Sequence, residues 1–97
     1  MRHAIVVLIL VLVGCGGGLP AATAIDASRV HVELADLQNG RSLVVSKCGA
    51  CHRPPMPADH GANEWPVMLD EMSARAHLDF MQRRLIRQYL VAMATRP

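Results

Sequence analysis

The sequence predicts a small all-α domain of about three helices. Apolar residues near the C-terminus recur at intervals of three and four, the spacing of a helix face, and no two segments form a convincing pair of strands. The 97 residues contain one Trp, one Tyr and one Phe, so the hydrophobic core is thin. Domains this small usually need a disulfide, a metal or a cofactor to be stable, and we expect one here.

The first 14 residues have the pattern of a signal peptide. Met-Arg-His supplies a cationic start, and residues 4–13 carry no polar side chain. An apolar run of this length is too short to anchor a chain across a bilayer, and a cluster of glycines follows it. We therefore expect the chain to be exported.

Two cleavage sites compete. Leu12-Val13-Gly14-Cys15 resembles a bacterial lipobox, in which the cysteine is lipidated and becomes the first mature residue. Ala22-Thr23-Ala24 is a small-x-small site for ordinary cleavage after Ala24. The lipobox directly follows the apolar run and is favoured. This predicts a signal peptide over residues 1–14, a flexible tether over 15–27, a folded domain over 28–97 and a membrane attachment through lipid on Cys15.

The charge of the expected mature domain gives no reason to predict nucleic-acid binding. From residue 25 onward there are nine Arg and Lys residues against eight acidic residues. A near-neutral domain lacks the basic excess that a nucleic-acid partner requires.

The first expected helix spans about residues 33–47, where Leu37, Gly40 and Val44 share a face. Its start is uncertain, because the alternation of Val30, Val32 and Leu34 would also suit a short strand. Three prolines then make residues 48–60 a loop without regular structure.

The second expected helix begins near Asn63, which can cap it, and Pro66 suits an early helical turn. Its apolar face consists of Trp65, Met68, Leu69 and Met72. The third begins at Asp79. Its apolar stripe consists of Leu78, Met81, Leu85, Tyr89 and Met93, and Ile86 and Leu90 widen it. Arg83, Arg84 and Arg87 occupy the other face and are expected to be solvated.

Cys48-Gly49-Ala50-Cys51-His52 is the motif that carries chemistry. Two thiols three residues apart, followed by an imidazole, fit a covalent c-type haem: the sulfurs bond to the vinyl groups and His52 ligates the iron. Alternatives are a redox disulfide or half of a zinc site. A zinc site would need further ligands, and only His31, His60 and His77 at irregular spacing could supply them.

Residues 40–52 resemble the first helix and haem-attachment segment of class I cytochromes c. In that family, a glycine eight residues before the first cysteine lets two helices cross closely, and Gly40 holds this position. The aromatic residue opposite it looks like Tyr89. The resemblance covers about residues 34–93 and implies one covalent haem c in an all-α domain.

The middle of the chain departs from mitochondrial-type members, in which the distal methionine comes from a longer loop. It is more similar to short bacterial mono-haem proteins with a proline-rich turn, then His-x-x-x-x-Trp, and a methionine seven residues after the tryptophan. These positions are His60, Trp65 and Met72.

The sixth iron ligand is therefore expected to be Met72, with Met68, His60 and Met81 as alternatives. Met56 lies only four residues after His52, and four residues span at most about 14 Å, too little to reach the opposite haem face. Trp65 is expected to pack against the haem.

These observations predict an electron carrier on the periplasmic side of a membrane that serves redox partner proteins, acts as a monomer and is not an enzyme. Two alternatives stay open. A haem-based sensor or small-gas binder would have an open sixth position, and a thiol–disulfide redox protein would carry no haem.

Overall fold

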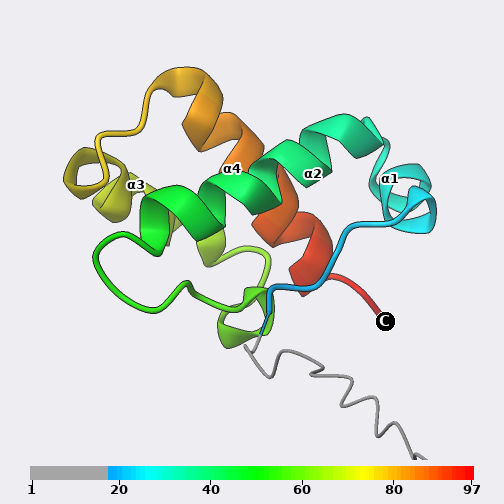
Figure 1. The fold of residues 1–97 in the computed structure, drawn as a ribbon. Coiled ribbons are helices and arrows are strands. Elements are labelled where there is room, and N and C mark those ends of the chain that lie inside the picture. The colour runs from blue at the N-terminus through cyan, green and yellow to red at the C-terminus, as the bar shows by residue number, and fades with distance from the viewer. Residues whose placement is uncertain (1–17) are drawn as a thin grey trace, which may run out of the picture.

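The computed structural model describes residues 18–97, which are all-helical (Figure 1). Its elements are α1 (Ala24–Val30), α2 (Leu34–Leu43), the π-helical turn η1 (Val44–Cys48), the 3₁₀ turn η2 (Pro57–Asp59), α3 (Trp65–Arg75) and α4 (Phe80–Ala94). No strand occurs among these residues, so the predicted all-α class is confirmed and the possible strand near residues 30–34 is wrong. In this part of the chain, no helix has the length and apolar character needed to cross a membrane.

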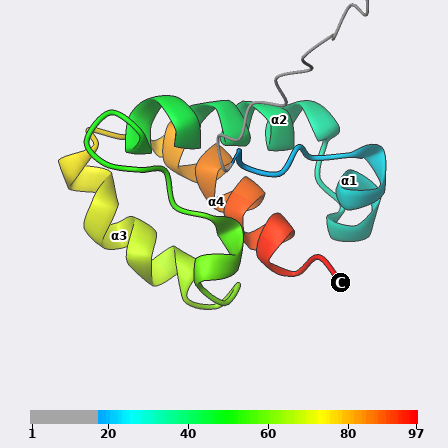
Figure 2. The ribbon, with the colours of Figure 1, turned by 60° about the horizontal axis from the view of Figure 1, so that its bottom comes forward.

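The core is built where α2 crosses α4, with α1 and α3 at opposite ends of α2 (Figures 1 and 2). A Cβ atom at Gly40 would overlap the carbonyl oxygen of Leu85 and lie 2.8 Å from Cβ of Tyr89. The helices can approach this closely only because Gly40 has no side chain. The expected juxtaposition of Gly40 and Tyr89 is confirmed.

Helix α4 begins as predicted, and its buried face includes the predicted stripe residues from Ile86 onward. Asp79 Oδ1 accepts a hydrogen bond from the Gln82 amide at 2.7 Å, and Gln82 Oε1 accepts one from the Asp79 amide at 3.1 Å. These bonds form a capping box. Met81 is 51% exposed because the first turn of α4 extends beyond the core. The buried residues are Ile86, Tyr89, Leu90, Ala92 and Met93.

Helix α3 begins at Trp65, and Asn63 does not cap it. The Glu64 and Trp65 amides instead donate to the carbonyl oxygen of Gly61, so the backbone already satisfies groups that a side-chain cap would bind. The preceding loop is also more regular than predicted. It contains the turn η2, where the Met56 amide donates to Asp59 Oδ2 at 2.9 Å.

The N-terminal boundary of the domain differs from the expectation. Leu19 and Ala22 are buried in the core, and α1 starts at Ala24. Thr23 caps α1 in a capping box with Asp26. Residues 19–27 therefore belong to the folded domain and are not a flexible tether. The expected signal peptide and Cys15 lie outside the described residues.

A buried carboxylate joins α1 to the C-terminal end of the chain. Asp26 is 3% exposed and accepts hydrogen bonds from Arg96 Nη2 at 2.6 Å and Arg96 Nε at 3.1 Å. The Thr23 amide and hydroxyl also donate to it, at 2.8 and 2.9 Å. The hydrogen bonds from Arg96, followed by those from Thr23, outweigh the effect of burial and hold the pKa of Asp26 well below its usual range.

This carboxylate makes stability depend on pH. Because the pKa of Asp26 is lower in the folded than in the unfolded chain, its contribution is complete above about pH 5 and is lost as the pH falls below about 4. We expect Asp26→Asn to lower the free energy of unfolding by about 1–3 kcal/mol at pH 7. The difference between wild type and variant, measured by urea unfolding from pH 7 to pH 2, should shrink as the pH falls. A constant difference would contradict this account.

Candidate functional site

The CxxCH motif begins at the end of η1, the π-helical turn that follows α2, and continues into the loop after it. Cys48 is the last residue of η1 and is buried, whereas Cys51 is exposed, and both thiols are free. The Gly49 amide donates to the Val44 carbonyl at 3.3 Å. A Cβ atom at Gly49 would overlap the Val45 carbonyl oxygen, so the turn itself requires glycine.

The His52 ring is exposed and oriented by one backbone hydrogen bond. Its Nδ1 atom lies 2.8 Å from the carbonyl oxygen of Arg53. A carbonyl oxygen only accepts, so Nδ1 carries a proton, and in the neutral imidazole the lone pair lies on Nε2. A neutral imidazole with a free Nε2 is the form that ligates a metal, and the hydrogen bond to the Arg53 carbonyl oxygen favours this tautomer.

The motif and α3 together line a cavity of about 280 Å³. Its lining consists of Lys47, Cys48, Cys51, His52, Met72, Arg75 and Ala76. Helix α3 thus brings Met72 to the same cavity as both thiols and the imidazole. Sequence reasoning missed Arg75, although it lies three residues after Met72 and therefore on the same helical face.

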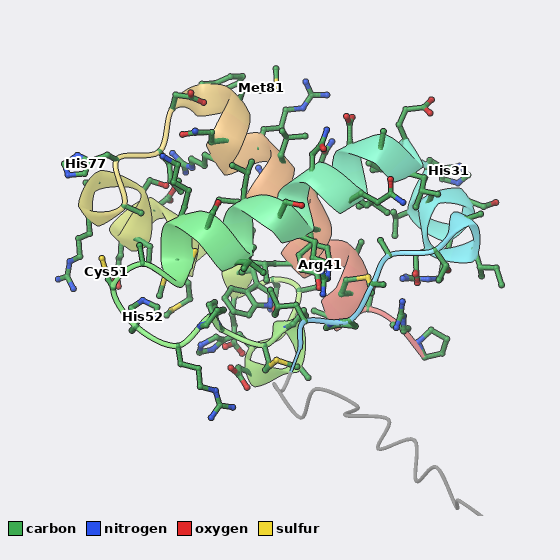
Figure 3. All side chains as sticks on the ribbon, in the orientation of Figure 1. His31, Arg41, Cys51, His52, His77 and Met81 are labelled. Carbon is green, nitrogen blue, oxygen red and sulfur yellow. The ribbon has the colours of Figure 1, made fainter. Side chains whose placement is uncertain are left out.

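The other candidates for the sixth ligand do not line this cavity. Met68 and Met56 pack against the hydrophobic core. His60 lies 3.3 Å from Glu64 through Nδ1 and contacts Trp65 edge-on, with ring centroids 4.9 Å apart. Met81 projects from the start of α4, away from Cys51 and His52 (Figure 3).

Trp65 and His77, two further residues singled out in the sequence, lie outside the lining of this cavity. Trp65 is completely buried, and its indole N–H donates to the Pro57 carbonyl at 2.9 Å. This bond ties α3 to η2, and Trp65 does not line the cavity. His77 adopts a left-handed backbone with φ of 53° between α3 and α4, and it also lies outside the cavity lining.

The residues at the cavity fit a covalently held haem. They provide two thiols for the vinyl groups, a free imidazole nitrogen and a thioether. Lys47 and Arg75 add positive charge that complements haem propionates. At about 280 Å³ the cavity is slightly below the usual range for small-molecule sites, about 300–1,000 Å³. A whole macrocycle would therefore reach beyond the cavity towards solvent or separate α3 from the motif.

No group of three or more His, Cys, Asp or Glu side chains within residues 18–97 is arranged to hold a metal ion. A haem site needs no such group, because the macrocycle supplies four iron ligands and the protein supplies at most two.

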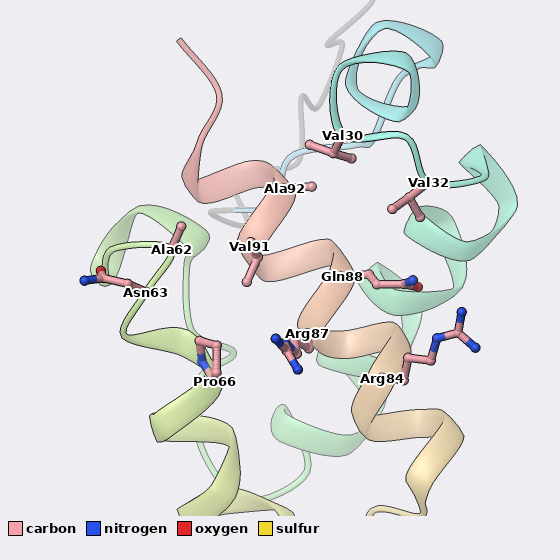
Figure 4. Close-up of a pocket in the computed structure, with 10 residues that line it drawn as sticks. All are labelled: Val30, Val32, Ala62, Asn63, Pro66, Arg84, Arg87, Gln88, Val91 and Ala92. Atoms are coloured by element: carbon pink, nitrogen blue, oxygen red, sulfur yellow. The ribbon is translucent and has the colours of Figure 1, made fainter.

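A larger cavity, of about 580 Å³, lies elsewhere, between α4, the start of α3 and the α1–α2 connection (Figure 4). Val30, Val32, Pro66 and Val91 form much of its apolar wall, and Arg84 and Arg87 also line it. No cysteine, histidine or methionine lines it, so it offers no iron ligand. The smaller cavity is the candidate site, because its residues carry the chemistry.

Comparisons with protein-family models, with curated proteins and with solved structures found no match to this chain. The resemblance to class I cytochromes c therefore depends on the residues of the motif and on their arrangement in this structure.

Proposed function

We propose that this protein is an electron carrier with one covalently bound haem c. The observation that carries the proposal is the single cavity shared by Cys48, Cys51, His52 and Met72. The cysteines and the histidine belong to one five-residue motif, whereas Met72 comes from helix α3. A methionine at this place supports a six-coordinate iron, which suits electron transfer better than ligand binding.

Each residue has a distinct role in this proposal. The thiols of Cys48 and Cys51 would hold the haem through thioether bonds, with sulfur and hydrogen added across its two vinyl groups. His52 offers Nε2 as the proximal ligand, held in orientation by its bond to the Arg53 carbonyl. Met72 offers its sulfur as the distal ligand. When bound, the haem supplies the one-electron couple, and the chain tunes its potential through these ligands and through burial.

Cys48 is poorly suited to thiol–disulfide exchange. Burial, and secondarily the neighbouring Cys51 thiol, raises the pKa of Cys48. Nucleophilic cysteines of redox enzymes have a lowered pKa, because the thiolate is the reactive form. This argues against Cys48 as the nucleophile of thiol–disulfide exchange.

Localisation and partners also belong to the proposal. The N-terminal sequence indicates export, which agrees with haem attachment on the periplasmic side. The partners would be redox proteins that approach the exposed part of the haem near Lys47 and Arg75, both on the cavity lining. No part of the proposal involves catalysis by the chain itself.

The proposal is tested with protein matured in a periplasm that attaches c-type haem. We expect a Soret band, reversible one-electron reduction in an electrochemical titration, and no binding of carbon monoxide to the ferrous protein. Carbon monoxide binding at micromolar concentration would contradict electron transfer and favour the gas-binding alternative. Absence of a Soret band would contradict haem binding altogether.

A further inference from the structure

The cavity of about 580 Å³ beside α4 has no part in the proposed haem site (Figure 4). Its volume lies within the usual range for small-molecule sites, about 300–1,000 Å³. None of its lining residues also lines the cavity beside the CxxCH motif. A ligand bound here would therefore not compete with a haem.

The two ends of this cavity differ in polarity. Arg84 and Arg87 lie at one end, and Val30 and Ala92 lie at the other (Figure 4). Ala92 comes eight positions after Arg84 on α4, which corresponds to about 12 Å along the helix axis. Val91, next to Ala92, is half-buried and adds to the apolar end. A ligand that fills the cavity therefore needs a polar head and an elongated apolar body.

The polar end of the cavity carries positive charge. Arg84 and Arg87 are exposed, and neither forms an ion pair with an acidic residue in the part of the chain that the structure describes. Their neighbour Arg83 differs, because it pairs with Asp70 of α3. No acidic residue lines the cavity. The head of a matching ligand is therefore an anion.

A carboxylate suits this end best. A guanidinium group binds a carboxylate through two parallel N–H donors. A carboxylate also carries a single charge, so it is less costly than a phosphate monoester to bring into a largely apolar cavity.

Gln88 adds a third polar group, between the two ends of the cavity (Figure 4). Its Oε1 atom is buried and has no hydrogen-bond partner within residues 18–97. An unpaired buried acceptor is unfavourable. The terminal torsion of glutamine has a broad range, so the amide can turn towards a donor in the cavity. A hydroxyl or amide N–H close to the carboxylate of the ligand would supply that donor.

We propose that this cavity binds an amphipathic carboxylate, an acid with one apolar chain and a hydrogen-bond donor near its head. A 3-hydroxy fatty acid of medium chain length has this chemistry. Arg84 and Arg87 bind the carboxylate, Gln88 accepts the hydrogen bond from the hydroxyl, and the chain lies along Val91 towards Val30. Binding is non-covalent and does not depend on the proposed electron transfer.

The first test is calorimetric titration of the full mature protein with 3-hydroxydecanoate, below the concentration at which the acid forms micelles. We expect saturable binding at one site per chain and no binding of decylamine, whose head is cationic. The Soret band should not change, because the iron would lie at the other cavity. The proposal would be overturned by a lack of saturable binding up to about 1 mM, by equal binding of decylamine, or by a change in the Soret band.

Single substitutions on α4 separate the two arginines from the general charge of the protein. Arg84→Gln and Arg87→Gln should each weaken binding of 3-hydroxydecanoate by about 10-fold. Arg83→Gln is the matched control, because it removes the same charge from the same helix but does not line this cavity. It should leave the affinity unchanged. Wild-type affinity in both test variants, or an equal loss in the control, would contradict the proposal.

Two further variants test the position of the chain and of the hydroxyl. Ala62→Phe places a ring in the cavity without changing the charge, so it should abolish binding. Ala62 is half-buried and lies outside the hydrophobic core, so the fold should persist, which urea unfolding checks. Wild-type affinity in a folded Ala62→Phe variant would contradict the assigned site, and the arginine variants decide the question if this variant does not fold.

The wild type should bind 3-hydroxydecanoate more tightly than decanoate, and Gln88→Leu should remove this preference. Equal affinities of the wild type for the two acids would overturn the role of Gln88.

Discussion

Replacing Met72 by alanine is expected to remove the sixth iron ligand while leaving the haem attached. Met72 lines the cavity together with the CxxCH motif. Its side chain takes no part in the covalent attachment, which depends on Cys48 and Cys51. The variant should lose the weak long-wavelength absorption band that methionine ligation gives to ferric haem. It should also bind carbon monoxide when reduced. If the iron–sulfur bond is worth about 3 kcal/mol, imidazole should bind the ferric iron on the order of 100-fold more tightly.

Met68→Ala is the matched control, because Met68 lies one helical turn before Met72 and packs against the core. It should lower stability, since it removes buried apolar surface, but it should keep the absorption band and the closed sixth position. Loss of the band in the Met68 variant, with the band retained in the Met72 variant, would show that the ligand is one turn earlier.

Much of the fold could be predicted because local signals and packing agree. Asp79 caps α4, as predicted from its position before the helical repeat of apolar residues. Gly40 marks the helix crossing because no other residue fits between the two backbones. Both features depend on residue properties that are visible in the sequence alone.

The N-terminal segment could not be predicted in the same way. Residues 15–27 are rich in glycine and alanine, and such a composition is typical of a tether. In the structure, its backbone carbonyl groups are bound by Arg41, Tyr89 and Arg96, which are distant in sequence. Hydrogen bonds to backbone groups leave no pattern in the side chains of the segment that accepts them.

One part of the candidate site could be predicted from the sequence, and another part could not. The CxxCH motif is local, so its chemistry can be inferred from spacing. The choice between Met68 and Met72 depends on which turn of α3 lies beside the motif, which the sequence does not specify. Both methionines lie on the face of α3 that carries Trp65 and Leu69. Met68 packs against the core, whereas Met72, one turn later, lines the cavity.

Loss of covalent haem is the largest effect that we expect from any substitution in the motif. Both cysteines are free thiols on the same cavity, and each would form one thioether bond. Replacing both Cys48 and Cys51 by alanine should abolish covalent attachment. A single replacement should leave one vinyl group unsaturated, with a corresponding shift of the pyridine haemochrome spectrum.

The most direct test of a covalent haem is the intact mass of the matured protein after acidified-acetone extraction. We predict that the polypeptide keeps the added mass of one haem, located on the peptide that contains Cys48 and Cys51, and that the double alanine variant lacks it. Haem that passes completely into the organic phase, leaving a wild-type chain of unmodified mass, would contradict the proposed function.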